Sequence, residues 1–104
     1  MTLYHATKEE NLRQILSDGL KPGIGEYAKE MGEKKAGIWL FPSYEDAMEM
    51  IPVWLEPFYG TKLALLRIDL PGSFPLEYTG SDYEVVSTVP IPVEYITLCS
   101  EPDE

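Results

Sequence analysis

The sequence predicts a single α+β domain, and three observations lead to this expectation. The chain has 104 residues, which is the length of one domain. Hydrophobic residues make up 44% of it, which is enough for a folded core. Apolar β-type segments and amphipathic helical segments follow one another in the order β-α-loop-β-α-β-β-β. Helices that come early and strands that come late favour helices packed on a mixed or antiparallel sheet.

The chain opens with a strand and a helix. Leu3–Ala6 is short, apolar and aromatic, as expected of a strand. Thr7 is then predicted to cap a helix over residues 8–18, because Glu10 stands three positions later and completes a capping box. Gly19 follows the last helical residue, where a left-handed stop is expected.

A loop, a second strand and a second helix come next. Residues 20–36 are rich in Gly, Lys and Glu and lack apolar periodicity, so we expect mainly a loop. Gly37–Phe41 is predicted to be a buried strand. Ser43 is expected to cap the second helix, with Asp46 in the capping-box position. Pro52 predicts a kink or an early stop in this helix. Its apolar face would consist of Ala47, Met50, Ile51 and Trp54.

The rest of the chain is rich in β-type segments. Leu63–Leu70 is a long apolar run, and Pro71-Gly72 after it predicts a turn. Tyr83–Ser87 and Tyr95–Cys99 are expected to be further strands, joined through the corner at Pro90-Ile91-Pro92.

Charge and composition restrict the function. Eight basic residues against eighteen acidic ones give a formal charge of −10, which disfavours nucleic acid and an anionic membrane surface and favours a basic protein partner. One histidine is too few for a multi-histidine metal site, so no metal is expected. Cys99, the single cysteine, is interpreted as a buried structural thiol. The opening residues carry no signal-peptide pattern, and a cytoplasmic protein is the expectation.

Three groups of segments carry the chemistry. They are Leu3-Tyr4-His5-Ala6-Thr7; Asp18-Gly19-Leu20 with the later Gly37-Ile38-Trp39-Leu40-Phe41 and Ser43-x-x-Asp46-Ala47; and Tyr83-Glu84-Val85-Val86-Ser87 with Val93-Glu94-Tyr95-Ile96. In this order they resemble the ADP-ribosyltransferase superfamily, in its diphtheria-toxin-like and poly(ADP-ribose)-polymerase-like branch. That branch has a His-Gly-Ser/Thr strand end followed by Gly-Leu, then a Gly-Ile-Tyr-Phe strand before a Ser-x-x-Ala helix, and later a glutamate opening a valine-rich strand. The resemblance covers nearly the whole chain.

The resemblance implies a compact fold in which a split sheet and two or more helices surround an NAD cleft, with NAD as co-substrate. His5 resembles the histidine that hydrogen-bonds the adenosine ribose. Ala6 occupies the position of the glycine whose backbone holds the nicotinamide amide, and Thr7 that of the hydroxyl residue facing the same pocket.

Two further residues complete the implied site. Trp39 stands where the family has a tyrosine that stacks on nicotinamide, and an indole also offers a π face to the cationic ring. Glu84 matches the catalytic glutamate. Loss of nicotinamide leaves positive charge on the ribose, and a fixed carboxylate stabilises that charge. The same carboxylate can help to deprotonate an acceptor.

The leading hypothesis is therefore a mono-ADP-ribosyltransferase that releases nicotinamide and modifies a protein or other acceptor. An inactive module of the same fold that binds a nucleotide or a protein is the alternative. Ala6, Trp39 and a helix that reads Met48-Glu49-Met50, without a second stacking aromatic, favour it. A related RNA 2′-phosphotransferase needs several arginines, and the chain has Arg13 and Arg67 alone.

Overall fold

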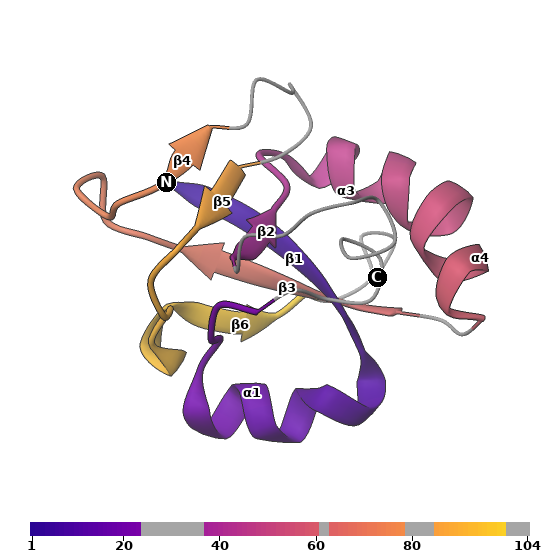
Figure 1. Ribbon diagram of the computed structural model, residues 1–104, viewed down its shortest axis with the longest axis horizontal. Coiled ribbons are helices and arrows are strands. Elements are labelled where there is room, and N and C mark those ends of the chain that lie inside the picture. Colours follow the sequence, from indigo (N-terminus) through magenta and orange to yellow (C-terminus); the bar gives the residue numbers. More distant parts are fainter. Residues whose placement is uncertain (24–36, 61–62, 79–84, 100–104) are drawn as a thin grey trace.

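The computed structural model describes residues 1–23, 37–60, 63–78 and 85–99. This part of the chain is α+β, as the sequence predicts, with two three-stranded antiparallel sheets and helices on both sides (Figure 1). The strands and helices are β1 (Thr2–Lys8), α1 (Leu12–Asp18), β2 (Ile38–Leu40), α3 (Tyr44–Met50), α4 (Glu56–Tyr59), β3 (Leu63–Asp69), β4 (Glu77–Tyr78), β5 (Val85–Ser87) and β6 (Ile96–Leu98).

The two sheets have the strand orders β1-β3-β6 and β2-β5-β4. β1 and β3 pair along their whole length, from Thr2 opposite Asp69 to Lys8 opposite Leu63. An isolated bridge joins the sheets, because Tyr4 and Phe41 exchange two backbone hydrogen bonds of 2.9 and 2.7 Å. The end of β2 is therefore held beside the middle of β1.

The predicted cap at Thr7 is wrong. Thr7 lies inside β1, where it pairs with Ala64, and a 3-10 turn over Glu9–Asn11 precedes α1. No side-chain cap forms at Lys8, which precedes this turn. Pairing with the long β3 strand extends β1 beyond its apolar residues, and this tertiary pairing overrides a local capping signal.

Gly19 ends α1, as the sequence predicts. Its N–H donates to the Ile15 carbonyl at 2.8 Å, and its φ of 85° is in the region that favours glycine. Its ψ of −176° differs from the left-handed stop that was expected. A Cβ at this position would lie 2.5 Å from the Ile91 carbonyl oxygen, so close approach also requires glycine.

The second predicted cap is confirmed. The Ser43 hydroxyl accepts a hydrogen bond from the Asp46 N–H at 3.1 Å and donates to the Asp46 carboxylate at 2.9 Å. α3 ends at Met50, before Pro52, and the chain continues through a π-helical segment at Ile51–Leu55 into α4. Proline has no N–H to donate to the preceding turn, and a wider turn accommodates it.

The later strands are shorter than the sequence predicts. Val93–Tyr95 forms a 3-10 turn, and β6 begins at Ile96. The predicted turn after β3 is confirmed, since the Phe74 N–H donates to the Pro71 carbonyl at 3.0 Å. β4 was not predicted, because two exposed residues carry no periodic signal. Of the expected strand at Tyr83–Ser87, the first two residues lie outside the described part, as do residues 24–36 of the expected loop.

The core has two parts on opposite faces of β1 and β3. One contains Ala47 and Ile51 of the α3 segment with Phe41 and Leu65. The other lies between the two sheets and α1, and its buried residues are Leu3, Ile15, Leu20, Ile38, Leu40, Leu66, Ile68, Leu70, Val85, Ile91 and Ile96. Figure 1 shows α1 on one side of β1 and β3, and α3 with α4 on the other.

Replacing Leu66 by Ala should destabilise the fold by about 2–5 kcal/mol, the usual cost of such a cavity. Leu66 is fully buried at the centre of β3. Val53→Ala is the control, because Val53 is 59% exposed, and it should change stability by about 0.5 kcal/mol or less. Urea unfolding of both variants tests the expectation, and equal midpoints would contradict the assignment of the core.

Candidate active site

The candidate site is built on the middle of β1 and the adjacent end of β2. Side chains alternate between the two faces of a strand, so His5 and Thr7 share one face with the core residue Leu3. Ala6 faces the other way and packs against the cluster that contains Ala47. The methyl group of Ala6 therefore packs on the face of the sheet that α3 covers.

His5 connects the two sheets. Its Nδ1 lies 2.9 Å from the backbone carbonyl oxygen of Trp39 on β2. A carbonyl oxygen can only accept, so Nδ1 carries the hydrogen and donates it. In the neutral imidazole Nε2 is then a bare acceptor. The structure thus brings together two of the residues singled out in the sequence.

The Nε2 atom of His5 has no hydrogen-bond partner among the described residues. The bond from Nδ1 is the imidazole's one hydrogen bond to a described residue. Within the described ranges, no buried side-chain nitrogen or oxygen lacks a partner. Nε2 is therefore not fully enclosed, and as an acceptor it can receive a hydrogen bond from a hydroxyl group.

Burial lowers the pKa of His5 below 6.5, and the hydrogen bond to Trp39 opposes this only in part. A histidine with a lowered folded-state pKa stabilises the protein fully above pH 6.5, and this contribution is lost as the pH falls toward the folded-state value. We expect the wild type to lose unfolding free energy relative to His5→Gln below pH 6.5. Urea unfolding of both proteins between pH 5 and 7.5 measures this difference. A difference that does not change with pH would contradict the neutral, desolvated imidazole.

The backbone of Ala6 is open toward the β2 side. Tyr4 exchanges its backbone bonds with Phe41, so its N–H and C=O point away from β3, and those of Ala6 point the same way. Leu65 lies opposite Ala6, and its carbonyl points away from β1, because it accepts a hydrogen bond from the Cys99 N–H at 2.9 Å. No described residue pairs with the backbone N–H and C=O of Ala6, which point toward the β2 side.

Thr7 adds a hydroxyl on the same face as His5. Its side chain is 9% exposed, and no described residue hydrogen-bonds to its oxygen. Because Thr7 caps no helix, the hydroxyl has no competing use there. His5, Ala6 and Thr7 thus place three polar groups on one stretch of strand, and no described residue uses the Nε2 atom, the backbone amide or the hydroxyl.

Trp39 supplies the aromatic surface of the site. It is half-buried and lies opposite Val86 in the pairing of β2 with β5. Its ring edge extends over Gly37, since a Cβ at Gly37 would be 3.7 Å from the Trp39 Cη2 atom. Glu84 lies outside the described residues. Val85, the residue that follows it, pairs with Leu40 next to Trp39.

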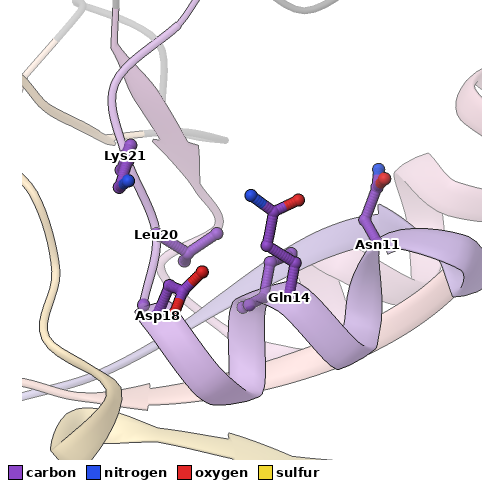
Figure 2. Close-up of a pocket in the computed structure, with 7 residues that line it drawn as sticks. Asn11, Gln14, Asp18, Leu20 and Lys21 are labelled. Carbon is purple, nitrogen blue, oxygen red and sulfur yellow. The ribbon is translucent and has the colours of Figure 1, made fainter.

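A groove along α1 was not predicted as a site. It encloses about 170 Å³, and Asn11, Gln14, Ile15, Asp18, Gly19, Leu20 and Lys21 line it. Figure 2 shows Asn11 and Gln14 projecting from one side of the helix, with Lys21 on the segment that follows. Polar residues three and four apart are also the pattern of any solvent-exposed helix face, so this spacing does not distinguish a site from an ordinary surface.

No protein-family model and no curated protein sequence matches this chain. The assignment of a function therefore depends on the geometry of β1 and β2 and on the resemblance of the motifs.

Among the described residues, no helix is both long and apolar enough to cross a lipid bilayer.

Proposed function

We propose that this protein binds NAD and transfers ADP-ribose from it to an acceptor, with release of nicotinamide. The backbone amide of Ala6 points toward the β2 side and has no partner among the described residues, and this observation carries the proposal. A carboxamide such as that of nicotinamide has one N–H donor group and one carbonyl acceptor. It complements the single donor and single acceptor of a strand residue whose amide points away from its neighbouring strand, and pairing two such amides leaves neither unsatisfied.

The neighbours of Ala6 suit the rest of the same ligand. The Nε2 atom of His5 accepts from a hydroxyl, which is the group that a ribose presents. The Thr7 hydroxyl can either donate or accept on the same face. The half-buried indole of Trp39 offers a π face to the cationic pyridinium ring, an attraction that strengthens as water is excluded.

We assign the chemical step to Glu84, on the resemblance of its motif. When the bond from nicotinamide to ribose breaks, its electron pair leaves with the nicotinamide, and positive charge develops on the ribose. A carboxylate held near this carbon stabilises the transition state more than the ground state. The acceptor then attacks the same carbon and loses a proton. The net charge of −10 favours a basic protein as the acceptor.

A second candidate is a module that binds NAD or a protein without catalysis. The observation in its favour is that the α3 segment places Met48 and Met50 against the hydrophobic cluster of Phe41 and Ala47. A helix that uses these positions for packing offers no second aromatic wall to nicotinamide. Binding energy alone does not accelerate a reaction, so such a module would bind NAD and leave it intact.

One experiment separates the two candidates. The purified protein is incubated with NAD, with and without cell lysate, and free nicotinamide is measured. Thermal unfolding with and without NAD is recorded in parallel, because a ligand of the folded state raises the melting temperature. Release of nicotinamide supports the transferase, and stabilisation without release supports the binding module. The proposal of an NAD site fails if neither is observed at millimolar NAD.

A further inference from the structure

Gly37 immediately precedes β2 and has no side chain, and the side chains of Val86 and Trp39 both come close to it. A Cβ at Gly37 would lie 2.5 Å from the Val86 Cγ1 atom and 3.7 Å from the Trp39 Cη2 atom. The Val86 methyl group therefore occupies the space that a side chain at Gly37 would need, and the Trp39 Cη2 atom lies at ordinary van der Waals distance from the same position.

Glycine is required here by space and not by backbone conformation. In the described part of the chain, the glycines with positive φ are Gly19 and Gly60, so any residue could adopt the backbone of Gly37. The close approach of Val86 is what excludes a side chain, because Cβ atoms essentially never come within 3.0 Å of a heavy atom of a non-neighbouring residue.

The backbone at Gly37 is held from both sides and has little room to retreat. It exchanges two hydrogen bonds of 3.1 and 3.2 Å with Gly23, in the segment after α1. On the other side, β2 pairs with β5, where Ile38 is opposite Ser87 and Trp39 is opposite Val86. Val86 is 9% exposed, so it is closely packed in its turn. A methyl group at residue 37 would therefore have to displace side chains.

We propose that Gly37 is a positioning residue, which together with Val86 forms a seat that sets the place of the Trp39 indole. The seat consists of the bare Cα of Gly37 and the Val86 methyl group that covers it. Its consequence for the ligand rests on the function proposed above. The plane against which nicotinamide would stack is fixed by this seat, and Gly37→Ala moves that plane without removing the ring.

The first measurement concerns the position of the ring and needs no ligand. The chain has two tryptophans, so Trp54→Phe leaves Trp39 as the only emitter. In this background, Gly37→Ala should shift the emission maximum and raise quenching by acrylamide. Adding Val86→Ala, which removes the crowding methyl group, should return both values toward those of the parent.

A matched control is available in the same backbone bridge. A Cβ at Gly23 meets nothing within 4 Å, and Gly23 makes the same two hydrogen bonds as Gly37. Gly23→Ala should therefore leave Trp39 emission unchanged. An unchanged spectrum in Gly37→Ala, or equal changes in both glycine variants, would overturn the seat.

Two further readouts keep the proposal falsifiable. Val86→Ala alone should loosen the indole and raise acrylamide quenching, and an unchanged quenching constant contradicts the seat even if Gly37→Ala does not fold. With NAD present, Gly37→Ala should lower nicotinamide release by up to about 10²-fold, the loss that a misplacement of roughly 1 Å can cause. Spectral changes that follow this pattern while the parent releases no nicotinamide would support the seat and refute the proposed transferase.

Discussion

Replacing Glu84 by Gln should lower the rate of nicotinamide release by about 10²–10³, with little change in the affinity for NAD. Glutamine keeps the size and much of the hydrogen-bonding shape of glutamate and removes the charge. A charge that faces the developing cation matters most in the transition state, so the loss should appear in kcat far more than in KM. Single-turnover release of nicotinamide at saturating NAD measures the effect.

Glu94→Gln is the control for this substitution. Glu94 is exposed on the 3-10 turn before β6. Glu94→Gln therefore removes the same charge at a position outside β2 and β5. It should leave the rate within about twofold of wild type, because exposed charges at a distance are screened by salt. Equal rates in Glu84→Gln and wild type would show that another group stabilises the transition state. The transferase proposal would then lose the residue to which we assign its chemistry.

The local signals in the sequence predicted the helix ends. Ser43 caps α3 and Gly19 ends α1, because both depend on side-chain and backbone chemistry within one or two turns. Thr7 carried a signal of the same strength and was predicted wrongly, since β1 continues through it to pair with β3. At Thr7 the choice between a helix cap and a strand depends on β3, which is distant in the sequence. A capping pattern contains no information about that partner strand.

The motifs of the sequence name the residues of the candidate site, but they do not contain the arrangement of those residues in space. The order of the motifs predicts one site for His5 and Trp39, and a hydrogen bond joins the His5 Nδ1 atom to the Trp39 carbonyl. This bond fixes the tautomer of His5, and the bridge between Tyr4 and Phe41 sets the direction in which the Ala6 amide points. A bridge between two sheets has no signature in the sequence of either strand.

Replacing Trp39 by Ala should abolish the NAD-dependent rise in melting temperature. At a concentration of NAD about 100 times its Kd, wild type should gain about 2.7 kcal/mol of stability from binding. We expect stacking on the indole to supply most of the affinity for the nicotinamide half. Without the ring, the Ala6 backbone amide alone is too weak to hold the ligand. Thermal unfolding over a series of NAD concentrations measures the change.

The quantity to compare is the NAD-dependent shift and not the melting temperature itself. Trp39 is half-buried, so its removal also costs packing and lowers the melting temperature in the absence of ligand. Tyr78→Ala is the control, because this aromatic side chain is 75% exposed on β4 and should leave the NAD shift intact. A full NAD shift in Trp39→Ala would mean that the dinucleotide binds away from β2, and the polar groove along α1 would then be the place to map it.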